Sequence, residues 1–189
     1  MPTATKKTGR PEMSEELGLP QGVSASLAGN VLTLKGPKGE AARHISEHTI
    51  TITAGPSAVS LKAKEGGKRD KKLLGSLRAH VLNMVRGVSE GHLYRLKVCY
   101  THFPVNASVS GSRFVVKNFL GEKTPREFEI PKGVKVDVKG VDITIESASK
   151  EAAGRVAASM EQLTKRANYD KRVFGDGIYI TAKDGKDIK

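Results

Sequence analysis

The sequence contains an internal repeat, and this repeat constrains the fold more than any other feature. When the chain is shifted by 82 positions against itself, Val23–Glu40 aligns with Val105–Glu122, and seven of the 18 aligned residues are identical. Average composition would give roughly one identity by chance. Apolar positions also coincide, as in Leu32 with Phe114 and Leu34 with Val116. Two copies of a unit this long do not make a solenoid, so we predict the duplication of a small domain.

The repeat continues further along the chain. Under the same shift, Val59, Leu61 and Ala63 align with Val141, Ile143 and Ile145, and the register drifts by about two residues between the blocks, as an insertion in a loop would cause. All nine aromatic residues lie after position 90. The two copies are therefore expected to have separate cores.

Each half has the same local patterns. Alternation of apolar and polar residues predicts short strands at 23–27, 31–34, 49–53 and 59–63, and again at 94–100, 113–116, 128–130, 134–138 and 141–145. Helical spacing predicts one helix with apolar residues from Leu73 to Val85, stopping at Gly87, and a second that Ser149 caps and that includes Leu163. We predict an α+β fold with two tandem homologous domains, each of short antiparallel strands packed with one helix around a single core.

The domain boundaries follow from these patterns. We expect a flexible basic arm at 1–17, the first α+β repeat at 18–88, the second at 89–182 and a flexible basic tail at 183–189.

The charge of the chain points to a polyanionic partner. Thirty-two Lys and Arg residues against 20 Asp and Glu residues give a formal net charge of +12 among 189 residues. Cations that neutralise phosphates release condensed counterions, so such an excess favours nucleic-acid binding. No apolar run approaches the ~18 residues that a membrane span needs, and the basic N-terminus lacks the apolar core of a signal peptide. We expect a soluble protein of a reducing compartment with no membrane partner and no cofactor.

Two patterns suggest catalysis or metal binding, but neither is well supported. His44, Glu47 and His48 match the H-x-x-E-H spelling of zinc peptidases. The following residues alternate with period two, and an extended chain would place the histidines roughly 13 Å apart, too far to share a zinc ion. Cys99 and His102 stand three apart on a predicted strand and would face opposite sides, so we expect a buried structural cysteine. The chain is therefore not expected to be an enzyme.

Positive charge gathers in two segments. The stretch 62–72 is expected to be a loop entering the first helix, either phosphate-binding or merely solvated; its candidate residues are Lys68, Arg69, Lys71 and Lys72. The stretch 165–179 interleaves cations with aromatic rings and glycines, a pattern that suits RNA because phosphates take the charge and rings stack on bases. Phe174 and Tyr179 could equally cover a core edge. The candidate residues here are Lys165, Arg166, Lys171, Arg172, Phe174, Gly175, Asp176, Gly177 and Tyr179.

Four motifs occur in order along the chain: Leu34–Glu40, Gly75–Gly91, Tyr100–Val105 and Arg172–Ile180. Together they resemble the large-subunit ribosomal protein L6 family, and the Phe-x-Asp-Gly-Ile-Tyr ending is similar to its archaeal and eukaryotic branch. The resemblance covers about residues 18–183. It implies two homologous α/β domains and a structural role in the cytoplasmic ribosome, with large-subunit rRNA and neighbouring ribosomal proteins as partners.

The resemblance also implies a location. Family members bind rRNA near the sarcin–ricin loop and the base of the stalk, where translation factors dock nearby, and the second domain carries much of the rRNA contact. By motif match, that contact falls on Arg172, Phe174, Asp176, Gly177 and Tyr179. The chain departs from the family at Arg166, where an aliphatic residue is usual, and at Tyr169, where a basic one is usual. The alternatives are a nucleic-acid-binding module outside the ribosome and the zinc-dependent hydrolase.

Overall fold

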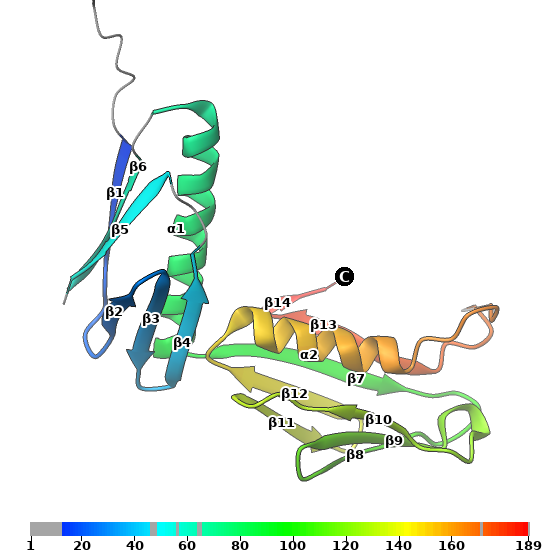
Figure 1. Ribbon diagram of the computed structural model, residues 1–189. Coiled ribbons are helices and arrows are strands. Elements are labelled where there is room, and N and C mark those ends of the chain that lie inside the picture. Colours follow the sequence, from blue (N-terminus) through cyan, green and yellow to red (C-terminus); the bar gives the residue numbers. More distant parts are fainter. Residues whose placement is uncertain (1–12, 46–48, 56, 64–65, 171, 189) are drawn as a thin grey trace, which may run out of the picture. The chain divides into compact units, whose positions relative to one another are not determined.

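The protein folds into two compact units, residues 1–90 and 91–189, in a computed structural model (Figure 1). The structure describes residues 13–45, 49–55, 57–63, 66–170 and 172–188. The division falls between Glu90 and Gly91, two residues after the boundary expected from the sequence. The α+β class with two tandem domains is confirmed.

The first unit consists of two small antiparallel sheets and one helix. Strands β2 (Ser24–Ala28), β3 (Val31–Gly36) and β4 (Gly39–His44) form one sheet in the order β2-β3-β4. Strands β1 (Met13–Gly18), β5 (Ile50–Ala54) and β6 (Ala58–Ala63) form the other in the order β1-β6-β5. Helix α1 (Lys68–Ser89) packs against both sheets.

The first core forms where the apolar side chains of β6 pack against those of α1. Val59 and Leu61 alternate with solvent-facing residues along β6, and Leu74, Leu77 and Val81 repeat at helical spacing along α1. All five are buried in one apolar cluster. Removing such side chains from water is the main favourable contribution to the stability of this unit.

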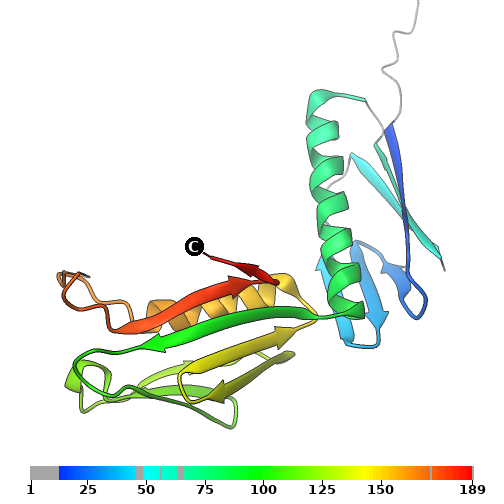
Figure 2. The same cartoon turned by 180° about the vertical axis from the view of Figure 1, so that it is seen from behind.

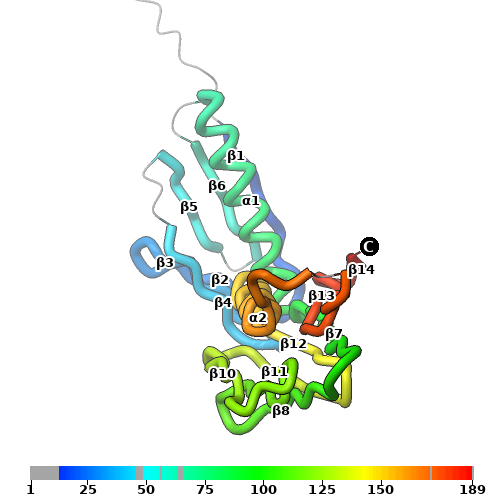
Figure 3. The backbone as a smooth tube through the Cα atoms, turned by 90° about the vertical axis from the view of Figure 1, so that its right-hand side faces the viewer, coloured from blue at the N-terminus to red at the C-terminus, as the bar shows by residue number. Residues whose placement is uncertain are grey.

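The second unit has the same plan with a larger sheet (Figure 2). Strands β8 (Asn106–Ser110), β9 (Arg113–Lys117) and β10 (Arg126–Glu129) form one antiparallel sheet, and the short 3-10 helix η1 (Phe119–Gly121) lies between β9 and β10. The order β11-β12-β7-β13-β14 forms the other, from β7 (His92–Cys99), β11 (Val134–Lys139), β12 (Asp142–Ser147), β13 (Gly177–Lys183) and β14 (Lys186–Asp187). Helix α2 (Lys150–Leu163) packs against β7, β12 and β13 and is seen end-on in Figure 3.

The duplication is visible strand by strand. The pairs β2/β8 and β3/β9 begin 82 positions apart, as the sequence shift predicts. The pair β6/β12 begins 84 positions apart, so Val59 and Leu61 correspond to the buried Ile143 and Ile145 rather than to Val141 and Ile143. The loop that carries η1 lengthens the β9–β10 connection, so β10 begins 87 positions after β4, and a shorter connection after β10 reduces the offset to 84 at β11. The sheet β5-β6-β1 is repeated as β11-β12-β7, to which β13 and β14 are added.

Parts of both ends that were expected to be flexible form strands in the structure. Met13–Leu17 belong to strand β1, which pairs with β6 and buries Leu17, so the expected arm of 1–17 is wrong for these five residues; 1–12 lie outside the described residues. In the expected tail of 183–189, β14 pairs with β13, while residue 189 lies outside the described part. Backbone pairing fixes these segments.

Helix α1 also begins earlier and ends later than predicted. It starts at Lys68, because the Asp70 carboxylate turns back and accepts a hydrogen bond of 3.3 Å from the Gly67 amide. It passes through Gly87 and ends at Ser89. Lys68, Arg69, Lys71 and Lys72 therefore lie on the first turn of a helix, not in a loop.

Candidate nucleic-acid interface

The basic and aromatic segment 165–179 connects the end of α2 to the start of β13. Its two ends are tied at Thr164, whose buried hydroxyl accepts a hydrogen bond from the Ile178 amide at 2.9 Å and donates one to the Glu161 carbonyl at 3.2 Å. The segment therefore leaves and returns to the same place on the second core. Its tip is free to carry side chains outward.

Asp176 holds the segment to the loop that follows β7. Its buried carboxylate accepts hydrogen bonds from the backbone amides of Thr101 and His102 and from the His102 ring, whose Nδ1 lies 2.9 Å from Oδ2. Because an ionised carboxylate only accepts, the imidazole carries its proton on Nδ1. Burial raises the pKa of Asp176, but the hydrogen bonds from His102 and Thr101 outweigh it and hold the pKa below its ordinary value. Asp176 is thus a buried, charged residue that holds the segment in place, and it does not face solvent.

An aromatic column lies next to Asp176 and consists of the side chains of His102, Phe174, Tyr169 and Arg166, each in contact with the next. The His102 and Phe174 rings lie 5.0 Å apart at 31°, and the Phe174 and Tyr169 rings lie 5.1 Å apart, edge to face. The Arg166 guanidinium covers the Tyr169 ring at 4.4 Å from its centre. Such contacts fix aromatic side chains in place. Phe174 is half-buried within this column, while Tyr169 is exposed.

Tyr179 lies on β13 and is 37% exposed. Its hydroxyl donates a hydrogen bond of 3.1 Å to the Gly175 carbonyl, and a Cβ placed on Gly177 would lie 3.4 Å from the ring. Gly177 therefore lets the ring lie close to the backbone, and the Gly175 carbonyl holds the hydroxyl. Burial raises the pKa of Tyr179, and so do the nearby charges of Cys99, Asp176 and Glu161.

The cations of this segment face solvent. Lys165 and Arg166 directly follow the α2 C-terminus, where the helix dipole favours positive charge, and both are exposed. Arg172 is also exposed, and its backbone amide is held by the Asp170 carboxylate at 2.9 Å. Lys171 lies outside the described residues. The structure brings Lys165, Arg166, Phe174, Asp176 and Tyr179 together around one cleft.

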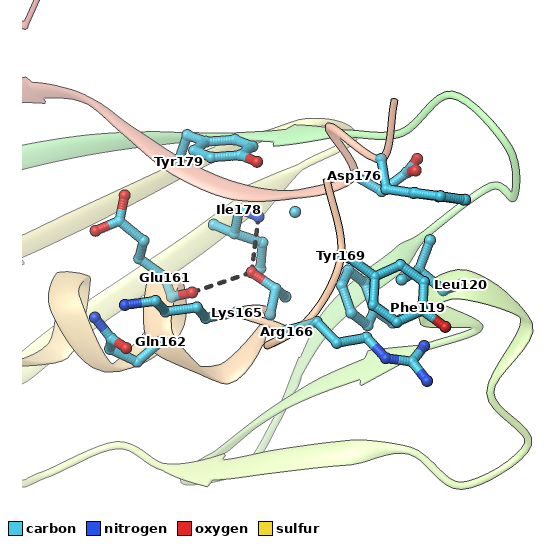
Figure 4. Close-up of a pocket in the computed structure, with 13 residues that line it drawn as sticks. Phe119, Leu120, Glu161, Gln162, Lys165, Arg166, Tyr169, Asp176, Ile178 and Tyr179 are labelled. Atoms are coloured by element: carbon cyan, nitrogen blue, oxygen red, sulfur yellow. Dashed lines mark hydrogen bonds between the residues drawn. The ribbon is translucent and has the colours of Figure 1, made fainter. Parts of the chain in front are cut away.

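That cleft has a volume of about 220 Å³ (Figure 4). Tyr179 and Ile178 lie on one side of it, and Lys165 lies opposite. Phe119 and Leu120 of η1 complete it together with Tyr169. Among the residues that the structure describes, the lining combines aromatic side chains with cations and the carboxylates of Glu161 and Asp176.

Sequence reasoning missed the residues that support this cleft. Arg126 makes two hydrogen bonds to the Glu122 carboxylate, of 2.8 and 2.7 Å, and a third of 2.6 Å to the Leu163 carbonyl at the end of α2. Its guanidinium also covers the Phe119 ring at 4.5 Å. Arg126, followed by Arg166, holds the pKa of Glu122 below its ordinary value. Glu122 lies only four residues before Arg126, but no local pattern shows the contacts of Arg126 with the Leu163 carbonyl and the Phe119 ring.

The first-unit cations form a second, separate group. Lys68, Arg69, Lys71 and Lys72 are exposed on the first turn of α1, while Asp70 between them is buried. Positive charges near the N-terminus of a helix interact unfavourably with the helix dipole. They belong to the first unit, whereas the cleft belongs to the second.

The structure also bears on the two patterns that suggested catalysis or metal binding. Cys99 is exposed, so the expected buried cysteine is wrong: Tyr94, Leu96 and Val98 point inward along β7, and Cys99 falls on the opposite phase. His44 is the last residue of β4, while Glu47 and His48 lie outside the described residues. Within the part of the chain that the structure describes, no group of three His, Cys, Asp or Glu residues could hold a metal ion, and no helix is long and apolar enough to cross a membrane.

Comparisons with known proteins place this architecture in a family. The family described as Ribosomal protein L6 matches residues 19–91 and 103–177, one match in each unit. The chain is 39% identical over 170 residues to the large ribosomal subunit protein uL6 of Methanobrevibacter smithii, covering 90% of this chain and 96% of that one. It is 41% identical over 171 residues to that of Sulfurisphaera tokodaii, covering 90% and 92%. For Nanoarchaeum equitans the identity is 39% over 186 residues, covering 94% and 97%. The chain therefore belongs to the ribosomal protein L6 family.

Proposed function

We propose that this chain binds large-subunit rRNA chiefly through the second-unit surface formed by Lys165, Arg166, Arg172, Phe174 and Tyr179. Family membership itself makes the chain a structural constituent of the large subunit in the cytoplasmic ribosome, with rRNA and ribosomal proteins as partners, and not an enzyme. It leaves no support for the zinc hydrolase or for a nucleic-acid module outside the ribosome. The choice of surface is the proposal.

The observation that carries the proposal is the fixed aromatic column beside exposed cations. Asp176 anchors the segment, so Phe174 and Tyr169 hold defined positions, and Arg166 lies over Tyr169. A surface arranged before binding loses less side-chain freedom when RNA arrives. Lys165 and Arg172 then meet phosphates, while the exposed rings are available to bases.

Gly175, Asp176 and Gly177 have supporting roles in this proposal. Gly177 lets the Tyr179 ring lie against the backbone, the Gly175 carbonyl accepts a hydrogen bond from the Tyr179 hydroxyl, and Asp176 positions the segment without touching RNA. Lys68, Arg69, Lys71 and Lys72 provide a second phosphate-binding group on α1. Cations at a helix N-terminus are locally unfavourable, and phosphates would offset that cost.

We further propose that the bound rRNA lies near the sarcin–ricin loop and the stalk base, close to where translation factors dock. The support is the resemblance of Tyr100–Val105 and Arg172–Ile180 to the family motifs. Both motifs meet in this structure, because His102 of the first binds Asp176 of the second.

Charge reversal tests the surface. Lys165→Glu with Arg166→Glu is expected to weaken binding to protein-free large-subunit rRNA roughly tenfold or more, since each lost charged contact costs about 1.5–3 kcal/mol. Lys132→Glu with Lys135→Glu makes the same change in net charge at exposed positions elsewhere in the second unit and is the control. Equal affinities of the two double variants would overturn the choice of surface.

Backbone footprinting tests the location. Hydroxyl radicals applied to the rRNA complex are expected to show protection at and beside the sarcin–ricin loop. Protection confined to other regions of the large-subunit rRNA would contradict the location but not the surface.

A further inference from the structure

We infer that the cleft at the end of α2 receives a single unstacked base of the bound rRNA, and that guanine is the base that fits it best. This inference rests on the proposed function, because it names what the same surface recognises. It assigns the cleft a base-reading role in addition to the phosphate contacts of the surrounding cations.

The size and walls of the cleft suit one planar ring system. Its 220 Å³ is below the ~300–1,000 Å³ of pockets that hold drug-sized ligands. Tyr179 provides an aromatic face, and Tyr169, Phe119 and Ile178 complete the walls (Figure 4). A base pulled out of a helix stacks on aromatic side chains in this way, whereas a paired helix is too thick to enter.

The Tyr179 ring is prepared for stacking before any base arrives. The hydrogen bond from its hydroxyl to Gly175 fixes the ring, and the missing side chain of Gly177 leaves space for the ring against the backbone. More than a third of the residue nevertheless stays exposed. An ordered, exposed ring at the edge of a cleft gains contact on binding and loses little freedom.

The carboxylate of Glu161 selects among bases. It lines the cleft from α2, where Gln162 also lies, and among the described residues no hydrogen bond or ion pair involves its side chain. Asp176, the other acid in the lining, is already engaged by His102 and Thr101. A free carboxylate only accepts hydrogen bonds. It therefore requires donors from the ligand.

Guanine offers the best match to that requirement. Its Watson–Crick edge presents two adjacent donors, the ring N1–H and the N2 amino group, which can meet the two carboxylate oxygens together. Uracil presents one donor flanked by two carbonyl acceptors, which a carboxylate repels. Adenine and cytosine present an amino group beside a bare ring nitrogen, so each satisfies only one carboxylate oxygen.

The surrounding charges accommodate the phosphates of the same nucleotide. Lys165 is exposed opposite Tyr179 (Figure 4), and the Arg166 guanidinium lies over the Tyr169 ring with one nitrogen 3.7 Å from the Glu122 carboxylate. A base stacked on Tyr179 in this cleft brings its own backbone to these cations. Cations on the rim complement the phosphates of such a nucleotide, and the hydrogen-bond acceptor inside the cleft complements the donor edge of its base.

Chemical probing of guanine tests the inference on the full chain bound to protein-free large-subunit rRNA. Kethoxal modifies N1 and N2 of unpaired guanine. We expect at least one guanine that is reactive in free rRNA to be protected in the complex, and to become reactive again with Glu161→Gln. Glu129→Gln, an exposed acid on β10, is the matched control and is expected to preserve the protection.

Two Tyr179 variants separate stacking from folding. Tyr179→Phe keeps the ring and is expected to protect the guanine. Tyr179→Ala removes it and is expected to restore reactivity and to weaken rRNA binding about 5- to 100-fold. Wild-type protection that survives both Glu161→Gln and Tyr179→Ala would overturn the inference, as would the absence of any protected guanine, as expected if the cleft holds a side chain of a neighbouring protein.

The outcome for the surface is measured in the same experiment. If Lys165→Glu with Arg166→Glu weakens binding while no guanine is protected, the base-reading inference fails and the proposed function stands. If that double variant binds as tightly as its Lys132→Glu/Lys135→Glu control, the proposed surface fails as well.

Discussion

The Asp176 carboxylate lies 2.9 Å from Nδ1 of His102, a residue 74 positions earlier in the sequence. This contact joins the loop after β7 to the segment before β13, where the motifs Tyr100–Val105 and Arg172–Ile180 meet. The same carboxylate also accepts hydrogen bonds from two backbone amides of the first loop. The proposed rRNA surface depends on this junction.

Replacing Asp176 is expected to loosen that junction. Asp176→Asn keeps the size of the side chain but removes the charge, and an amide cannot accept at both positions. We expect a loss of about 1–3 kcal/mol in the free energy of unfolding, measured by urea denaturation. Asp170→Asn, at an exposed position of the same segment, is expected to cost less than half as much. Equal losses would contradict the role given to Asp176.

The free energy of unfolding of the second unit is expected to decrease at low pH. The pKa values of Asp176 and Asp184 are both held below the ordinary Asp value of 3.8. Since the unfolded chain takes up these protons first as the pH falls, the stabilisation is complete above the ordinary pKa and is lost as the pH falls through the lower folded-state values. Urea midpoints measured across this range are expected to fall toward low pH. The fall should be smaller in Asp176→Asn; identical pH profiles would contradict the assignment.

Two glycines of the first unit are expected to respond in opposite directions. A Cβ on Gly36 would lie 2.6 Å from the Val88 carbonyl oxygen, in the last turn of α1, so Gly36→Ala forces backbone apart and is expected to cost about 1–3 kcal/mol. Gly75 lies within α1 with open space around it, so Gly75→Ala is expected to stabilise the unit by about 1 kcal/mol. Thermal unfolding of both variants measures the difference. Similar shifts in the same direction would contradict the packing of β3 on α1.

Removing the Arg126 guanidinium is expected to disturb the residues that support the cleft. Arg126 links Glu122, Leu163 and the Phe119 ring, so Arg126→Met keeps the apolar stem but leaves the Glu122 carboxylate without its main partner. We expect a loss of about 1–3 kcal/mol in stability and a rise in the pKa of Glu122, followed by NMR titration. A Glu122 pKa unchanged by the substitution would show that Arg126 is not its partner in solution.

Local patterns predicted the elements, and long-range contacts decided the rest. The duplication, the strands β2, β3, β5, β6, β7, β9, β11 and β12, and the cap of α2 by Ser149 follow from periodicity and capping chemistry, and the cap is seen as a hydrogen bond of 3.3 Å from the Ala152 amide. The alternation of Tyr94, Leu96 and Val98 could also have shown that Cys99 points outward.

The remaining features could not be read from neighbours in sequence. Strand β1 pairs with β6 about 45 positions later, and its Ser-Glu-Glu run has no strand signal of its own. Helix α1 begins five residues before its first apolar residue because Asp70 caps it. The tie between Arg126 and Leu163 joins positions 37 apart. In the candidate site, the sequence suggested which residues are candidates for binding, but not which residues hold them in place.

The salt dependence of rRNA binding tests the central claim most directly. We expect the logarithm of the association constant for protein-free large-subunit rRNA to fall steeply with the logarithm of salt concentration, with a slope of several contacts at about 0.7–0.9 per phosphate. Lys165→Glu with Arg166→Glu is expected to reduce the slope by about two contacts relative to the Lys132→Glu/Lys135→Glu control. A wild-type slope of about one contact, or equal slopes in the two double variants, would contradict the claim.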